Sequence, residues 1–504
     1  MGDEGISSPG KRTVGTAFWE RGTDDVSPGR EVNPRVKDIQ VSRREALLGQ
    51  AAQIRHGLRQ GSNKPYKELI DICWGDAHSA GMKPITFVRQ VLAACIHPEL
   101  LLHGDRLPAD ARHRAQRLLG ECDGGSIGSY TATSGLPHVK RSVAEFITRR
   151  DGGVRSLPEN ISICSGSQRA LMLVLNLLAQ GEGVSQTGVL TPVPTCNTAA
   201  MALAEAGVVT VPYQLCEEQR WALQTDELCR VLRASRGHCD PRVLYVANPG
   251  NPTGHVQSRE SIEEVIRLAA EERLFLLVNE VDQDSVHAEG CEFVSYRKVL
   301  FEMGPPFSDM VELVSVHSIA RGFMGEGGMR AGYMEILNMD PAVKSWLVEA
   351  LMCRDINTPV LGQIALDIMV DPPRPGDPSH ATYTEEVRSR RETLIGNVGR
   401  VQEVLDALPG VSCQPVMGGN YVFPRLHLPT AAVDQAQSVG VEADLLYCKL
   451  LLEEEGLCVG PGCEFGQREG THHIRLHVMV PTEALDDALG RLKRFHLRFM
   501  RTFS

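Results

Sequence analysis

The feature that most constrains this chain is the alternation of short β-rich runs with helical patterns from about Ile161 onward. The strand-like runs are Ile161–Cys164, Val243–Ala247, Leu274–Val278 and Val311–Val316. Between the second and third runs, apolar residues recur at i, i+3, i+4 and i+7 from Ile262, and Ser261 and Glu264 have the spacing of a helix capping box. This order predicts an α/β fold around a mostly parallel sheet.

Polar and glycine-rich segments follow the carboxyl ends of these runs. The septet N-P-G-N-P-T-G occupies residues 248–254, Asn279-Glu280 follows the third run, and a segment ending in Arg321-Gly322 follows the fourth. Open α/β sheets bind ligands outside the carboxyl ends of their strands. We therefore expect a ligand site where these segments meet.

Charge and composition exclude several other classes of function. A formal net charge of -11 over 504 residues argues against non-specific nucleic-acid binding, which needs a basic surface. The longest apolar stretch, residues 171–179, is about half of the roughly 20 residues that a membrane span needs. Fourteen cysteines without a C-x-x-C pair predict reduced intracellular thiols, and we predict no metal site.

The N-terminal 30 residues carry no apolar period and predict a disordered tail. Its arginines resemble those of a mitochondrial transit peptide, but its acids (Asp3, Glu4, Asp24 and Asp25) do not. We expect a cytoplasmic protein, with a mitochondrial location as the alternative.

Proline marks the expected domain boundary. The stretch at residues 371–378 contains four prolines and cannot continue a helix or a central strand, so we take it as a hinge. The predicted division is a tail at 1–30, a small domain at 31–105 and 372–504, and a large domain at 106–371.

The 248–254 septet, taken with three other motifs, resembles the class I aminotransferases of pyridoxal-phosphate fold type I, and within them the alanine aminotransferases. The other motifs are Lys83–Phe87, Thr148–Gly153 and Phe465–Thr471. The resemblance extends from Asn33–Val36 to the C-terminal helix. It implies a large domain with a mostly parallel seven-stranded sheet, a smaller α+β domain, pyridoxal 5'-phosphate as cofactor, and a role in alanine and amino-acid metabolism.

Several residues match positions that hold the cofactor or substrate in that family. Asn251 matches the asparagine on the phenolic oxygen of the cofactor, and Ser318 and Arg330 match its phosphate ligands. Ser167 belongs to the segment Ser165-Gly166-Ser167 that precedes a helix, and the N-terminal N–H groups of a helix form an anion site.

Two further matches concern the substrate and the partner subunit. Arg475 matches the arginine that binds the substrate α-carboxylate, and Tyr130 matches a tyrosine that reaches the phosphate of the neighbouring subunit. The resemblance thus implies an amino-acid or 2-oxo-acid ligand and a homodimer.

Five positions depart from the family pattern. Arg321 replaces the lysine that forms the Schiff base and moves the proton, and a guanidinium is a very poor amine nucleophile. Asn279 replaces the aspartate that keeps the pyridine nitrogen protonated. Asp282 and Cys196 replace two tyrosines that contact the ring, and Gln168 replaces a phosphate-contacting serine.

These departures predict a catalytically impaired aminotransferase, a pseudoenzyme that binds pyridoxal phosphate or a related metabolite without a covalent bond. We also expect Asp282 and Arg321 to form a direct buried ion pair, because each charge is costly to bury alone. One alternative is an active L-alanine:2-oxoglutarate aminotransferase that makes pyruvate and L-glutamate, with His317 or Cys196 carrying the proton. Another is a ligand-free structural protein or a heterodimer partner of an active relative.

Overall fold

The computed structural model describes residues 43–102 and 106–504. The predicted tail at 1–30 and the Asn33–Val36 motif lie outside the described residues. None of the helices in the described ranges is long and apolar enough to cross a bilayer.

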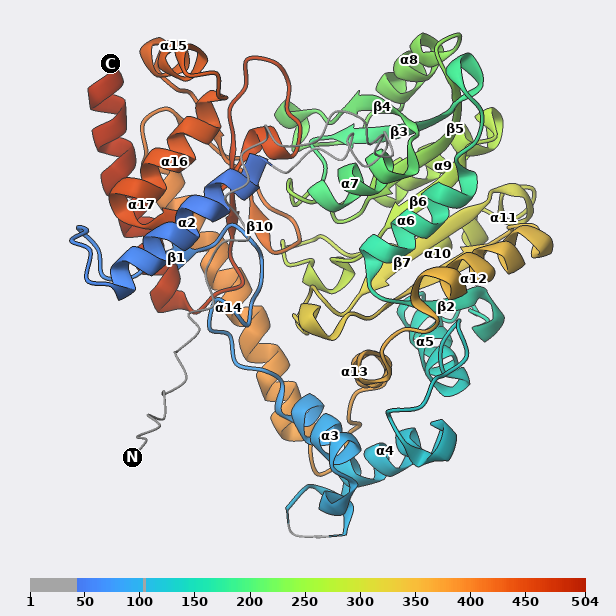
Figure 1. The fold of residues 1–504 in the computed structure, drawn as a ribbon. Coiled ribbons are helices and arrows are strands. Elements are labelled where there is room, and N and C mark those ends of the chain that lie inside the picture. Colours follow the sequence, from blue (N-terminus) through green and yellow to red (C-terminus); the bar gives the residue numbers. More distant parts are fainter. Residues whose placement is uncertain (1–42, 103–105) are drawn as a thin grey trace, which may run out of the picture.

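A seven-stranded sheet forms the centre of the larger part of the molecule (Figure 1). In spatial order its strands are β2 (Ile161–Cys164), β8 (Gly332–Leu337), β7 (Leu313–Ser318), β6 (Phe275–Asn279), β5 (Asp240–Ala247), β3 (Thr187–Val193) and β4 (Val209–Gln214). Only β8 runs against its neighbours. The predicted α/β fold with a mostly parallel seven-stranded sheet is therefore confirmed.

Apolar side chains on both faces of the sheet hold the helices. On β5, Val243 and Tyr245 pack into one cluster and Leu244 and Val246 into another. The first cluster contains residues of α6 (Ser167–Leu178), α7 (Asn197–Ala206) and α12 (Pro341–Asp355). The second contains residues of α8 (Thr225–Ser235), α9 (Arg259–Glu272) and α10 (Tyr296–Glu302). Period-two alternation thus gives the sheet two buried faces.

The predicted capping box of α9 is wrong. The helix begins one turn earlier, and the Ser258 side chain accepts a hydrogen bond from the Ser261 backbone N–H. Ser258 has the extended backbone that an N-cap residue needs, whereas Ser261 already lies inside the helix.

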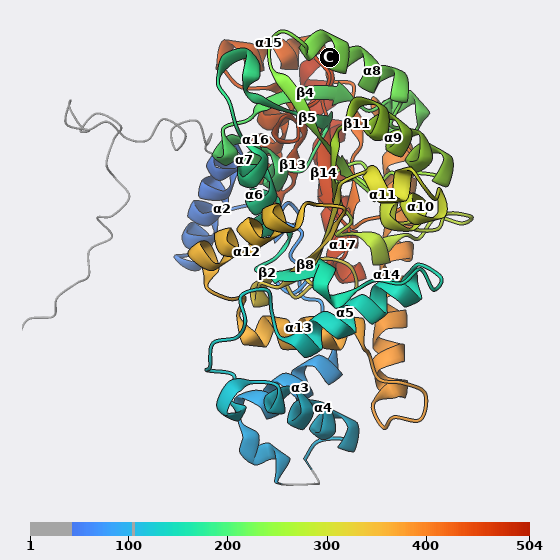
Figure 2. The ribbon, with the colours of Figure 1, turned by 90° about the vertical axis from the view of Figure 1, so that its right-hand side faces the viewer.

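A third cluster of buried apolar side chains lies below the sheet in Figure 2. Its helices are α3 (Thr86–Ile96), α4 (Ala109–Gly120), α5 (Pro137–Arg150) and α13 (Val360–Val370). The predicted boundaries assign α3 to the small domain, but its buried residues pack with α4 and α13. The exact domain boundaries stay a prediction.

The smaller part has its own apolar core, to which residues from both ends of the chain contribute. Its helices are α2 (Arg43–Arg59), α15 (Thr430–Ser438), α16 (Ala443–Glu455) and α17 (Thr482–Phe503). Its short strands are β1 (Ile70–Asp71), β9 (Val411–Ser412), β10 (Tyr421–Val422), β11 (Arg425–Leu426), β12 (Leu457–Cys458), β13 (Gly460–Pro461) and β14 (Ile474–His477). The long helix α14 (His380–Asp406) joins the two parts: Tyr383 packs with α3, and Leu394 to Leu405 pack in the smaller core (Figure 1). The proline-rich segment precedes this connecting helix.

Candidate functional site

A cavity of about 510 Å³ lies at the carboxyl ends of the parallel strands, and we call it the strand-end cavity. Ten of the eleven predicted site residues line it: Ser167, Gln168, Cys196, Asn251, Asn279, Asp282, Ser318, Arg321, Arg330 and Arg475. The eleventh, Tyr130, is not among the lining residues and is 73% exposed. The sheet topology accounts for this convergence, because segments that follow parallel strands meet at one edge.

One end of the strand-end cavity, which we call the phosphate end, consists of the start of α6, Ser318 and Arg330. Arg330 Nη2 donates to the Ser165 carbonyl at 2.8 Å, and Nη1 donates to the Gly327 carbonyl at 3.2 Å. A Cβ on Gly166, which has φ +94°, would come within 3.0 Å of Arg330 Nη2. Glycine therefore lets the guanidinium lie against the first turn of α6, where free N–H groups favour an anion.

Arg475, which is predicted to bind the substrate α-carboxylate, is almost fully buried. Its Nη2 donates to the Cys73 carbonyl at 2.8 Å, and Nη1 donates to Asn251 Oδ1 at 3.2 Å. The guanidinium lies 4.1 Å from the Tyr421 ring centre and 4.4 Å from the Phe465 ring centre. Arg475 Nε has no hydrogen-bond partner in the described chain, so the group keeps a free donor.

The other end of the cavity, which we call the ring end, consists of Arg321, Asp282, Asn279 and Cys196. The predicted ion pair between Asp282 and Arg321 is wrong. Arg321 Nη1 donates to the Gly75 carbonyl, and the guanidinium lies 5.4 Å from the Tyr421 ring centre. In the described part of the chain, none of the ion pairs includes the Asp282 carboxylate, and its Oδ1 has no hydrogen-bond partner. The short aspartate side chain does not reach a guanidinium that the Gly75 carbonyl holds elsewhere.

The two charges still influence each other through the cavity. Burial raises the pKa of Asp282, and Arg321 and Arg475 oppose that rise. Burial alone would lower the pKa of Arg321, but Tyr421, Asp282 and other neighbours hold it above its ordinary value. Arg321 therefore stays a cation and cannot serve as an amine.

Asn279 meets a residue that the sequence analysis missed. Its Nδ2 donates to the Tyr245 hydroxyl at 3.1 Å, and its Oδ1 accepts from the Val281 N–H at 3.3 Å. The Cys196 thiol lies 3.7 Å from the same hydroxyl. Asn279, Tyr245 and Cys196 thus form a neutral cluster where the family pattern has an aspartate and a stacking tyrosine. Tyr245 lies inside a strand-like run, so its sequence position indicates only a buried residue.

Behind the ring end lie two polar residues that do not line the cavity, the buried His317 and the half-buried Asp284. The His317 ring packs edge-on against Tyr333 with 5.3 Å between ring centres, and its Nε2 lies 3.8 Å from Asp284 Oδ1. Burial, together with Arg150, lowers the pKa of His317 to about 3, while burial raises the pKa of Asp284 to about 7. His317 is therefore neutral, and it is not among the residues that line the cavity, where a proton carrier would act.

Two other missed residues come from distant loops. The Gly75 carbonyl binds Arg321, and a Cβ at Gly75 would lie 2.0 Å from the Tyr421 hydroxyl oxygen. Only glycine fits there, and its φ of +69° also favours glycine. No motif in the sequence marks Gly75 or Tyr421, because their roles depend on how the two parts of the molecule pack.

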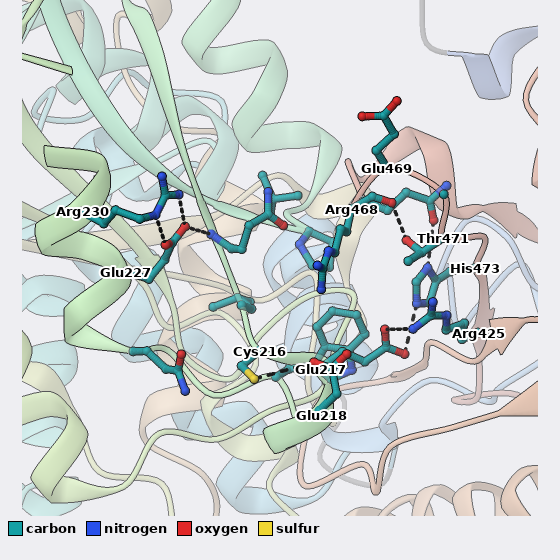
Figure 3. A pocket seen from close by; sticks show the side chains of 18 residues that line it. Cys216, Glu217, Glu218, Glu227, Arg230, Arg425, Arg468, Glu469, Thr471 and His473 are labelled. Atoms are coloured by element: carbon teal, nitrogen blue, oxygen red, sulfur yellow. Dashed lines mark hydrogen bonds and ion pairs between the residues drawn. The ribbon is translucent and has the colours of Figure 1, made fainter. Parts of the chain in front are cut away.

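A second cavity, of about 570 Å³, lies between β4, α8 and the loop at residues 467–473 (Figure 3). Its charges compensate one another: Arg230 pairs with Glu227 at 2.6 Å, and Glu217 contacts Arg425 at 3.4 Å and His473 at 3.3 Å. None of its described lining residues has a buried polar side-chain atom without a partner. The strand-end cavity, where Asp282 and Arg475 keep such atoms, is the stronger candidate site. No cluster of three or more metal-ligating side chains occurs in residues 43–102 or 106–504.

Comparison with known proteins identifies the scaffold that carries this cavity. The model of aminotransferase class I and II matches residues 99–492. The chain belongs to this family. It is 47% identical to alanine aminotransferase 2 of Xenopus laevis over 94% of this chain and 87% of that protein. It is 37% identical to a Saccharomyces cerevisiae protein named inactive alanine aminotransferase, over 94% of both chains.

The fold agrees with solved structures of the family. An alanine aminotransferase from Pyrococcus furiosus superimposes with a TM-score of 0.71 at 18% identity, covering 93% of this chain and all of that one. Membership of this family implies pyridoxal phosphate as cofactor, and the cavity can be tested against it. The phosphate end fits a phosphate, and Asn251 keeps its amide N–H₂ group for a phenolic oxygen. None of the described residues lining the cavity is a lysine, so this lining offers no side-chain amine for a Schiff base.

Proposed function

We propose that this chain is a catalytically impaired, alanine-aminotransferase-like protein that binds pyridoxal phosphate or a related phosphorylated metabolite without a covalent bond. The observation that carries the proposal is the position of Arg321. Its guanidinium lines the cavity just beyond β7 and donates to the Gly75 carbonyl, in a cavity whose described lining contains no lysine.

The phosphate end supports ligand binding. Ser318, Arg330 and the start of α6 would hold the phosphate, and Asn251 would orient the ring through its amide group. When bound, pyridoxal phosphate supplies an aldehyde and an electron-withdrawing pyridine ring. Arg475 keeps a free N–H for a carboxylate next to that ring.

The ring end supports loss of turnover. Arg321 cannot take or release a proton at neutral pH, so it supplies neither a nucleophile nor a base. Asn279 offers the ring nitrogen an amide in place of a carboxylate, and that amide already bonds Tyr245. Charged hydrogen bonds contribute about 1.5–3 kcal/mol and neutral ones about 0.5–1.5 kcal/mol, which corresponds to a loss of about one to two decades in rate from Asn279 alone.

Active alanine:2-oxoglutarate transamination is not favoured. It would need another group to move the proton, and the two candidates are His317 and Cys196. His317 lies outside the cavity lining, and Cys196 contacts Tyr245 and Thr198. Neither His317 nor Cys196 is therefore placed as a base for proton transfer within the cavity.

The decisive test uses pyridoxal phosphate and borohydride reduction. We expect the wild-type chain to bind the cofactor with no reduced adduct on a cavity residue, as measured by peptide mass spectrometry. Arg321→Lys should acquire the adduct at position 321, and Arg321→Lys combined with Asn279→Asp should recover alanine transamination. Wild-type turnover comparable with an active alanine aminotransferase contradicts the proposal, and so does a chain that binds neither pyridoxal phosphate nor pyridoxamine phosphate.

We also propose a homodimer with a cytoplasmic location, the latter with a mitochondrial location as the alternative. Tyr130 supports the dimer, because it is 73% exposed and the family places its hydroxyl at the phosphate of the neighbouring subunit. The acidic residues Asp3 and Glu4 support the cytoplasm. Light scattering after size exclusion tests the dimer, and fractionation of cells that express the untagged chain tests the location.

A further inference from the structure

Asp282 is the buried group that the proposed function leaves without a partner. It follows β6, lines the strand-end cavity and is 4% exposed. Its Oδ1 has no hydrogen-bond partner, and none of the ion pairs in the described part of the chain includes its carboxylate. A buried carboxylate without a donor is unfavourable, so this position calls for a donor from a bound molecule.

The two neighbouring cations bond groups other than Asp282, although Arg475 keeps its Nε–H free. Arg321 donates to the Gly75 carbonyl, and Arg475 donates to Asn251 and to the Cys73 carbonyl. Both guanidinium groups also lie over the Tyr421 ring. Among the described lining residues, Asp282 therefore offers a buried acceptor without a donor, near two cations that suit an anion.

We propose that Asp282 receives the primary ammonium group of a bound anion, so that the cavity prefers the amine form of its ligand to the carbonyl form. This inference rests on the proposed function of the same cavity. An ammonium group has three donors and complements a carboxylate, whereas an aldehyde or ketone oxygen only accepts. The described lining contains no lysine, so a carbonyl ligand cannot gain affinity by forming a covalent bond with a lining amine.

Two sources share this chemistry. One is the aminomethyl form of the phosphorylated pyridine, pyridoxamine phosphate, with its phosphate at Arg330. The other is a free α-amino acid with its carboxylate at Arg475. Charge-assisted hydrogen bonds of this kind predict a preference of about ten- to a hundredfold for the amine form.

Isothermal titration calorimetry on the full chain tests the preference with three matched pairs. The pairs are pyridoxamine phosphate against pyridoxal phosphate, L-alanine against pyruvate, and L-glutamate against 2-oxoglutarate. We expect the amine to bind more tightly in the pair that matches the natural source. Asp282→Asn should reduce that preference to within about threefold, because an amide has no charge to pair with the ammonium group.

Asp76→Asn is the matched control. Asp76 is the other carboxylate among the described lining residues, but it is exposed and accepts a hydrogen bond from the Ser79 N–H at 3.0 Å. The Asp76→Asn chain should keep the preference. If Asp282→Asn does not fold by circular dichroism, Asp282→Ser removes the same charge with less bulk.

Equal binding of amine and carbonyl forms by the wild-type chain overturns this inference and leaves the proposed function intact. Retention of the preference by Asp282→Asn, or its loss in Asp76→Asn, also overturns it. If none of the phosphorylated pyridines, amino acids or oxo acids binds, the proposed function fails as well. The two failures are therefore distinguishable in one set of titrations.

Discussion

The two ends of the strand-end cavity are built in different ways. At the phosphate end, backbone carbonyls fix Arg330, and the Ser318 hydroxyl lies 3.2 Å from the Ala331 carbonyl oxygen. At the ring end, Asp282 and Arg321 are charged side chains, and the partner of Arg321 comes from residue 75, far away in the sequence. Side chains that bond to nearby backbone carbonyls keep their place when other residues of the cavity change, whereas the ring end depends on contacts between distant segments.

The largest expected effect is on the pH dependence of the free energy of unfolding. We expect Asp284 and His317, which lie behind the ring end, to contribute to it in opposite directions. Burial raises the pKa of Asp284 from 3.8 to about 7, so folding takes up a proton there and its contribution to stability falls as pH rises from about 4 to 7. The pKa of His317 falls from 6.5 to about 3 on burial, so its contribution is lost as pH falls from about 6.5 to 3. In the wild-type chain the two slopes oppose each other.

Each single variant should reveal one slope. The Asp284→Asn chain keeps only the His317 slope, so its free energy of unfolding should rise with pH between about 4.5 and 6.5. The His317→Gln chain keeps only the Asp284 slope, so its free energy of unfolding should fall over the same range. At about 1.4 kcal/mol per pH unit, each effect amounts to about 3 kcal/mol between pH 4.5 and 6.5. Urea unfolding at several pH values measures both, with Ser318→Ala at the phosphate end as a control that should keep the wild-type profile. The same slope in both variants would contradict the two assigned pKa shifts.

Affinity for the phosphate group should depend on the phosphate end alone. Arg330→Gln removes a charged donor, so we expect about ten- to a hundredfold weaker binding of pyridoxal phosphate, measured by calorimetry. Arg321→Gln is the matched variant at the ring end and should weaken binding by less than about threefold. The reverse order would show that the ring-end cation holds the phosphate.

Stability without ligand should change in opposite directions for the two ring-end charges. Asp282→Asn removes an unpartnered buried charge and should stabilise the chain by about 1–3 kcal/mol at pH 7.5. Arg321→Gln removes a cation that offsets this charge and should destabilise it. Urea unfolding measures both, and Asp76→Asn, on an exposed carboxylate, should change stability by less than about 0.5 kcal/mol. A destabilising Asp282→Asn would mean that Asp282 has a partner in the folded chain.

The smallest effect concerns the neutral cluster. Tyr245→Phe leaves the Asn279 amide without its acceptor and should cost about 0.5–1.5 kcal/mol of unfolding free energy, measured by urea unfolding. It should leave phosphate affinity unchanged, because the cluster lies at the ring end. No change in stability would indicate that Asn279 finds another acceptor.

The location of the site was predictable from the sequence, because parallel strands bring their carboxyl ends to one edge of the sheet. This rule, with the family pattern, was enough to bring Asn251, Asn279 and Ser318 into one cavity. The capping box of α9 was predicted one turn too late, because Ser258 and Ser261 both suit a cap and only the backbone conformation distinguishes them. The Asp282–Arg321 pair was predicted from charge alone and is wrong, because charge gives no direction to a side chain.

The sequence by itself determined the class of fold, the order of the polar segments that follow the strands, and the presence of an arginine, with no amine, at position 321. Periodicity and residue chemistry are local properties, so they can be read along the chain. Only the tertiary structure decided that Arg321 is held by the Gly75 carbonyl, that His317 lies outside the cavity and that Asp282 has no partner. These outcomes depend on the packing of segments that are distant in sequence, and local patterns do not specify that packing.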